Sequence, residues 1–293
     1  MIKKGIPALL ILLLALSCGH VTKNPDKHVI TVSIPPFEYF VKEIAGNDFV
    51  VNVMLPPGAD HHSWEPLPGQ VSALAGSEAF IINGYLGFEY AWMDRFREVN
   101  PKMKISNISE NIDLIRPEVT ETHTGHHHDE EGTDPHYWIS PKEAFRIAAS
   151  VKDLVISLNP DSASKYNTGY KRLLGKISKT DSTVTALLKS APSRTFLIFH
   201  PALGYLARDY GLEQISFEDE GKDPSPARMK ELVDLTRSKD IKIIFIQAEY
   251  NPRSAGVLAS ETGAKLVSIN PLNPDWQFAV MEVVKAISEP DQK

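Results

Sequence analysis

Three histidines occupy positions where α/β proteins place their ligands. His62 follows an apolar run in PPGADHHSWEP, His136 precedes a helix-like segment in DPHYW, and His200 ends the apolar run TFLIFH. In open α/β sheets, ligands bind beyond the carboxyl ends of the strands. The histidines are 74 and 64 residues apart, so only the tertiary fold could bring them together. We expect them to meet in a cleft between two lobes, where they would hold a metal ion.

The donor set favours zinc. Neutral imidazole binds Zn²⁺ at about 2.0–2.1 Å, and three imidazoles with one oxygen complete a tetrahedron. Mg²⁺ and Ca²⁺ prefer oxygen ligands, and Mn²⁺ would be expected with more carboxylates. Because a protonated imidazole cannot bind, affinity should fall below about pH 6. His61 could equally be the ligand in place of His62, and any one of the ten histidines could instead be an ordinary surface residue.

Strand-like and helix-like segments alternate along the chain, which predicts an α/β fold of two βα lobes with mainly parallel sheets. The β-branched run at 28–34 opens one lobe and the apolar run at 194–200 opens the other. Ser140, Pro141 and Glu143 predict a helix start with an N-cap, a proline at the first position and a capping box.

A long polar segment separates the two series of strands. Apolar residues recur at helical spacing over 161–190, which predicts one long helix with a narrow apolar stripe that connects the lobes. The predicted divisions are a signal peptide at 1–17, a lipid tether at 18–27, an N-terminal metal-binding lobe at 28–159, a linker helix at 160–192 and a C-terminal lobe at 193–293.

The N-terminus is typical of an export signal. Lys3 and Lys4 precede the apolar stretch IPALLILLLALS, which is shorter than the roughly 20 residues of a spanning helix. Cys18 is the only cysteine, which excludes an internal disulfide and a cysteine-based zinc site. Its surroundings resemble a bacterial lipoprotein box, although Ala15 stands where Leu is more usual. The resemblance implies cleavage before Cys18 and lipid on its thiol; the alternative is a soluble secreted protein with a stray cysteine.

The charge balance argues against a nucleic-acid partner. Removing Lys3 and Lys4 from the 31 basic side chains leaves 29 against 37 acidic ones. Nucleic-acid binding needs a basic surface, which an acidic mature chain does not favour.

Five motifs in one order carry a family resemblance. They are PPGADHHSWEP, DPHYWISP, FHPALGYLARDYGL, PSPARMKEL and ETGAKLVSINPL. The chain resembles the zinc- and manganese-binding solute-binding lipoproteins of bacterial metal ABC transporters over nearly its whole mature length. This resemblance implies two β/α lobes joined by one long helix, with the metal in the cleft between them.

The resemblance also implies the ligands. His62, His136 and His200 match the first three family ligands, and His at the third position is typical of zinc receptors, where manganese receptors tend to carry Glu. The fourth ligand departs from the family pattern, because the usual Asp-Pro-Leu motif reads NPL here. Asn270, Glu249, His61 and water remain candidates for that position.

Several neighbours of the ligands also invite predictions. Glu65 and Asp134 could accept hydrogen bonds from ligand imidazoles. Trp64, Tyr137 and Trp138 are expected to shield and pack. The loop 123–131 resembles the His/acid-rich loop of zinc-specific members, and could be either a zinc collector or an inert solvated loop.

The function implied is extracytoplasmic capture of Zn²⁺ and its delivery to an ABC permease. The protein is expected to be a lipid-anchored monomer at a membrane, in a periplasm or at a cell surface, without enzymatic activity. One alternative is a receptor for Mn²⁺ or another divalent metal. Another is a zinc-dependent hydrolase with an open fourth site, although the HExxH motif is absent from the sequence.

Overall fold

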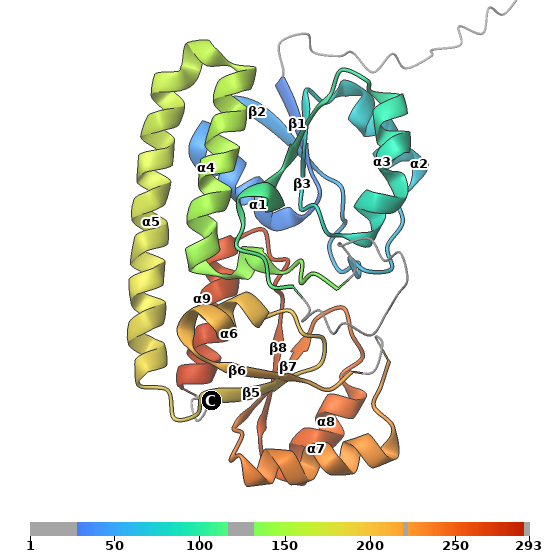
Figure 1. The fold of residues 1–293 in the computed structure, drawn as a ribbon, viewed down its shortest axis with the longest axis vertical. Helices are drawn as coiled ribbons and strands as arrows, with labels where there is room; N and C mark the ends of the chain where they lie inside the picture. The colour runs from blue at the N-terminus through green and yellow to red at the C-terminus, as the bar shows by residue number, and fades with distance from the viewer. Residues whose placement is uncertain (1–27, 117–131, 219–221, 290–293) are drawn as a thin grey trace, which may run out of the picture.

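The chain forms two α/β lobes, each built on a four-stranded parallel sheet (Figure 1). This computed structural model describes residues 28–116, 132–218 and 222–289. The predicted signal peptide, the tether with Cys18 and the loop 123–131 lie outside the described residues. Within those described ranges, no helix has both the length and the apolar character that crossing a bilayer requires. The predicted fold class of two mainly parallel βα lobes is confirmed.

The first lobe has the strand order β2-β1-β3-β4, and every pairing is parallel. Helices cover both faces of the sheet, as parallel sheets require, and β3 is buried throughout. The lobe comprises β1 (His28–Val32), α1 (Pro35–Ala45), β2 (Phe49–Val53), α2 (Pro68–Ala73), β3 (Ala79–Ile82), α3 (Gly87–Val99), β4 (Lys104–Asn107) and α4 (Pro141–Leu158).

The second lobe repeats this plan with the order β6-β5-β7-β8, again parallel. Its central strand β7 is fully buried, and α7 and α8 pack together on one side of the sheet. The lobe comprises β5 (Thr195–Ile198), α6 (Gly204–Tyr210), β6 (Glu213–Ser216), α7 (Pro226–Ser238), β7 (Ile243–Gln247), α8 (Arg253–Thr262), β8 (Lys265–Ile269) and α9 (Trp276–Ser288).

The predicted long helix is α5 (Ala163–Lys189), which runs down one side of the molecule, from the end of α4 to the start of β5 (Figure 1). It packs against α1 and α4 of the first lobe and against α9. The helices approach closely at Gly169, where a Cβ would lie 2.2 Å from the carbonyl oxygen of Ile44. Only glycine allows this approach, so α5 is held tightly along the first lobe.

The two lobes share buried contacts beyond α5. The indole of Trp138, just before α4, donates to the carbonyl of Pro271 at 2.9 Å, and the indole of Trp276 on α9 donates to the carbonyl of Trp138 at 2.7 Å. The Trp276 ring also packs 5.7 Å from that of Phe40 on α1. The helix α9 therefore belongs to the core of both lobes. The predicted domain boundaries at 159/160 and 192/193 stay a prediction.

One local prediction was wrong. Ser140 caps α4 through the backbone N–H of Lys142, as predicted, but Glu143 does not complete a capping box. Its carboxylate instead accepts from Arg208 of α6 at 2.6 Å, because the lobes meet at this helix end. The helix α6 begins at Gly204, after a turn in which the N–H of Ala202 donates to the carbonyl of His200.

Candidate metal centre

Two adjacent histidines are presented by the loop that follows β2. The Asp60 carboxylate accepts from the backbone N–H of His62 at 3.0 Å and from the Ser63 hydroxyl at 2.8 Å. The Asp60 carbonyl accepts from the N–H groups of Ser63 and Trp64, which closes a tight turn. The ring centroids of His61 and His62 are consequently only 4.1 Å apart, so both side chains point to one side of the loop. His61 is buried and His62 is exposed.

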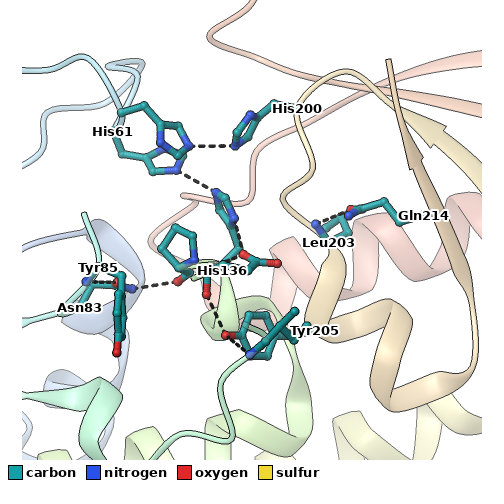
Figure 2. Close-up of polar contacts among 12 residues, drawn as sticks. His61, Asn83, Tyr85, His136, His200, Leu203, Tyr205 and Gln214 are labelled. Atoms are coloured by element: carbon teal, nitrogen blue, oxygen red, sulfur yellow. Dashed lines mark hydrogen bonds and ion pairs between the residues drawn. The ribbon is translucent and has the colours of Figure 1, made fainter. Parts of the chain in front are cut away.

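The third histidine precedes α4. Asp134 accepts from both the backbone N–H of His136 at 2.9 Å and its Nδ1 at 2.7 Å. The segment is fixed on both sides, since the Asn83 amide donates to the carbonyl of Pro135 and the Tyr205 hydroxyl donates to the carbonyl of Asp134 (Figure 2). The His136 ring is buried and held in one orientation.

The fourth histidine follows β5 in the second lobe. The Nδ1 of His200 donates to Glu218 at 2.7 Å, just beyond the neighbouring strand β6. The Gln247 amide at the end of β7 donates to the His200 carbonyl at 2.6 Å. Because β5, β6 and β7 are parallel neighbours, their carboxyl ends meet at one edge and place these three side chains together.

The four imidazoles converge in the space between the lobes (Figure 2). We call His61, His62, His136 and His200 the histidine cluster; one ligand atom from each lies within 4.8 Å of the others. The Nε2 atoms of His61 and His136 are 2.8 Å apart, as are those of His62 and His200. A tetrahedral zinc ion with bonds of about 2.0–2.1 Å would separate its ligand atoms by roughly 3.3 Å, so small shifts would admit the ion.

Burial sets the protonation of this centre. Desolvation, followed by repulsion from neighbouring imidazoles, lowers the pKa of His61 and His136 well below the usual value, and it lowers the pKa of His62 too. Burial raises the pKa of Asp134 to about 6, so its carboxyl group is still ionised at neutral pH. His61, His62 and His136 are therefore neutral at neutral pH, which is the state that a metal ion requires.

The two carboxylates also fix the tautomers. An ionised carboxylate only accepts hydrogen bonds, so the Nδ1 atoms of His136 and His200 carry the protons. Their Nε2 atoms then offer free lone pairs toward the centre. Carboxylates that orient ligand imidazoles in this way are typical of metal sites.

The structure tests the neighbours expected from sequence. Asp134 accepts from His136 as predicted, but Glu65 is exposed and is not among the described carboxylates bonded to cluster imidazoles, so that prediction was wrong. The second carboxylate that accepts from a cluster imidazole is Glu218. The sequence did not reveal it, because it is 18 residues from its partner His200. The only signal in the sequence for Glu218 was an acidic residue just beyond the strand that follows His200.

The predicted aromatic residues pack as expected. Tyr137 and Trp138 are fully buried, and the Trp138 ring lies 5.3 Å from His136 and 6.0 Å from His61. Trp64 packs edge to face with Phe88 at 4.9 Å. The Trp138 ring therefore packs directly against the cluster.

Two candidates for the fourth ligand lie elsewhere. Glu249 and Asn270 line a cavity of about 160 Å³ together with Glu38 and several prolines, and no cluster histidine lines it. Glu249 is not part of the group of ligand atoms among the described residues. The Asn270 side-chain oxygen accepts from the backbone N–H of Leu272 at 3.0 Å. His61 is the candidate that lies beside the other three histidines.

Two known proteins resemble this chain over most of its length. The zinc-binding lipoprotein AdcA of Streptococcus pneumoniae is 28% identical over 280 residues, which cover 92% of this chain and 55% of AdcA. The high-affinity zinc uptake system protein ZnuA of Bacillus subtilis is 28% identical over 276 residues, which cover 89% of this chain and 85% of that protein. The chain thus spans about half the length of its streptococcal relatives.

Solved structures agree in fold. A crystal structure of ZnuA superposes with a TM-score of 0.82 at 32% identity, over 90% of this chain and 98% of that one. A zinc-bound ZnuA variant lacking residues 138–173 superposes with a TM-score of 0.81 at 31% identity, over 92% and 99% of the two chains. Residues 30–288 match the family model described as zinc-uptake complex component A, periplasmic. The chain therefore belongs to this family, ZnuA.

Proposed function

We propose that this protein captures Zn²⁺ outside the cytoplasm and delivers it to an ABC permease, with His62, His136 and His200 as ligands. The observation that carries the proposal is the convergence of imidazoles from both lobes within 4.8 Å of one another. Four imidazoles that gather at one place from distant parts of the chain are typical of a metal site. The relatives named as zinc-binding and zinc uptake proteins support the same ion.

The donor set favours zinc over other divalent ions. The ligand atoms are nitrogens, and Asp134 and Glu218 contact imidazoles rather than the centre. Zinc accepts an all-imidazole environment, whereas Mg²⁺ and Ca²⁺ need oxygen and Mn²⁺ binds more weakly to nitrogen sites. A manganese receptor, the alternative within the family, would be favoured by a carboxylate in place of His200.

A receptor fits the site better than a hydrolase does. A catalytic zinc keeps an open position for water and needs a base near it. The carboxylates of Asp134 and Glu218 each accept from an imidazole, and that of Asp60 accepts from the His62 N–H and the Ser63 hydroxyl, so all three already hold structural hydrogen bonds. We therefore propose binding without catalysis, which an assay for ester and peptide hydrolysis by the zinc-loaded protein checks.

Attachment to the membrane completes the proposal. Lipid on Cys18 would hold the receptor near its permease and raise the local concentration of loaded protein. The streptococcal relative AdcA is named a zinc-binding lipoprotein, which supports this anchor. We propose a monomeric receptor on the outer side of the cytoplasmic membrane. Mass spectrometry of the membrane-extracted protein would show a lipid-modified N-terminal cysteine, and a Cys18→Ala protein should appear in the soluble fraction.

Metal binding is tested by elemental analysis of protein purified without chelators and by zinc titration in competition with a chelator. His62→Ala, His136→Ala and His200→Ala should each weaken binding by at least about a hundredfold, since a ligand is lost. His28→Ala is the matched control, because His28 is bonded to Glu78 on the surface, outside the cluster. Unchanged affinity in all three cluster variants would sink the assignment.

Delivery needs its own test. Cells that lack the chromosomal copy should grow poorly in zinc-depleted medium, and the wild-type chain together with the His28→Ala control should restore growth. The three ligand variants should not restore growth. Restoration by added manganese instead of zinc would favour the manganese receptor.

A further inference from the structure

We propose that His61 is the fourth ligand, so that the ion is held by four imidazoles in a closed sphere. This inference rests on the proposed function and adds the residue that sets metal specificity. Its starting point is the setting of His61, which is only 2% exposed and lies against His136 and Trp138. Its Nδ1 has no hydrogen-bond partner among the described residues.

The hydrogen bond between His61 and His136 has a defined direction. Asp134 accepts the Nδ1 proton of His136, so the Nε2 of His136 carries only a lone pair. The Nε2 of His61, 2.8 Å away, must therefore be the donor. In the metal-free protein His61 is then protonated at Nε2, and its unpartnered Nδ1 holds the other lone pair.

Metal binding removes the acceptor of His61. An ion that takes the Nε2 lone pair of His136 leaves the N–H of His61 without a partner, next to a second nitrogen that already lacks one. An unsatisfied buried polar group destabilises the protein, because it has lost its hydrogen bonds to water without gaining another. If His61 instead moves its proton to Nδ1 and binds the ion through Nε2, only one nitrogen stays unsatisfied. Ligation is therefore the better state for this imidazole.

The geometry permits this ligation. The ligand atom of His61 lies within 4.8 Å of those from the other three histidines, as a single ion requires. The tight turn at Asp60 points His61 and His62 toward one place, so both can reach the ion without unfolding the loop. Glu249 and Asn270, the rival side chains, line a cavity that no cluster histidine lines.

A site of four imidazoles would bind Zn²⁺ in preference to Mn²⁺. A closed tetrahedron of nitrogens suits Zn²⁺ and leaves no position for water. Mn²⁺ prefers six ligands with carboxylate and water oxygens, so it gains little from this sphere. His61 should therefore raise both zinc affinity and the ratio of zinc to manganese affinity.

The test uses the mature chain labelled with ¹⁵N in its histidine rings and loaded with one equivalent of zinc. Long-range ¹H–¹⁵N NMR distinguishes a metal-bound ring nitrogen from a free or protonated one. We expect four metal-bound imidazoles, and His61→Phe, which keeps the bulk of the ring, should lose one of them. His61→Phe should also bind zinc ten- to a hundredfold more weakly and show a smaller preference over Mn²⁺.

The outcomes separate this inference from the proposed function. The four-imidazole site would be overturned by stoichiometric zinc binding with three metal-bound imidazoles and a free ring for His61. The proposed receptor function would still stand. Failure of the wild-type chain to bind zinc would overturn both. If His61→Phe does not fold, His61→Gln provides the assignment, and the number of metal-bound rings in the wild-type chain still decides.

Discussion

The carboxylate of Glu218 offers the sharpest test of how the centre is held. Its Oε1 accepts from the Nδ1 of His200 at 2.7 Å, both side chains are 12% exposed, and its Oε2 has no hydrogen-bond partner among the described residues. The carboxylate thus serves His200 alone. Glu218→Ala leaves the imidazole free to rotate and to place its proton on Nε2, where it would block the metal. Loss of such a partner costs about ten- to a hundredfold in metal affinity.

That loss corresponds to roughly 1.4–2.7 kcal/mol of binding free energy. Glu218→Gln keeps an acceptor oxygen and the tautomer but removes the charge, so it should lose less affinity than Glu218→Ala. The matched control is Glu231→Ala, which removes the same charge from an exposed position paired with Arg228 on α7. The assay is competition with a zinc indicator at neutral pH, alongside melting temperatures of the metal-free proteins. Equal zinc affinity in Glu218→Ala and Glu231→Ala would refute the reasoning.

Three further predictions concern the frame and the protons. Gly169→Ala should destabilise the protein by about 1–3 kcal/mol through overpacking, whereas Gly175→Ala on the same helix meets nothing within 4 Å and should stabilise it by up to about 1 kcal/mol; equal melting temperatures would contradict this. Burial raises the pKa of Glu89 to about 7 from 4.5, so its contribution to stability is complete below about pH 4.5 and is lost as pH rises through 7. Glu89→Gln should remove that decline, on the order of 3 kcal/mol, in denaturant unfolding measured across this range; parallel pH profiles would exclude Glu89 as its source. Because burial lowers the pKa of His61, His62 and His136, protons should displace zinc from these three imidazoles only as pH drops through those lowered values, which a series of chelator competitions checks. A fall of about tenfold or more between pH 7 and 6 would contradict this reading.

The secondary structure was accessible from sequence because its boundaries are marked locally. Gly46 ends α1 with a positive φ, and Ser225 caps α7 through the backbone N–H of Arg228. The burial of β7 on both faces follows from its continuous apolar run. Such signals depend only on neighbouring residues, so the pattern of alternating strands and helices needed no tertiary information.

The centre itself was accessible only in part. His136 and His200 could be selected because each adjoins the end of a strand or the start of a helix. His61 could not be separated from His62, because the direction of adjacent side chains depends on the turn that Asp60 closes. Glu218 depends on the register between β5 and β6, which no local pattern encodes.

The same limit explains the misassigned role of Glu143. A capping box is a local motif, and Ser140 with Glu143 satisfies its sequence requirement. The side chain of Glu143 is only 3% exposed. A buried carboxylate without a cationic partner destabilises the protein strongly, whereas a second cap adds little to a helix that Ser140 already caps. Arg208 supplies that partner from the other lobe, so a tertiary ion pair outcompetes the local hydrogen bond.

The contacts between the lobes bear on how the centre could open. Arg208 joins α6 to α4, the indoles of Trp138 and Trp276 bond across to the other lobe, and α5 packs along both α1 and α9. The helices α4, α6 and α9 lie on the side of the molecule that carries α5 (Figure 1), while the cluster histidines lie in the loops that follow β2 and β5 and in the segment before α4. His136 and His200 are fixed to that frame by Asp134 and Glu218. His61 and His62 depend instead on the turn after β2. Since a short loop deforms at lower cost than a shared core, entry and exit of the ion should involve that turn before they involve rotation of the lobes.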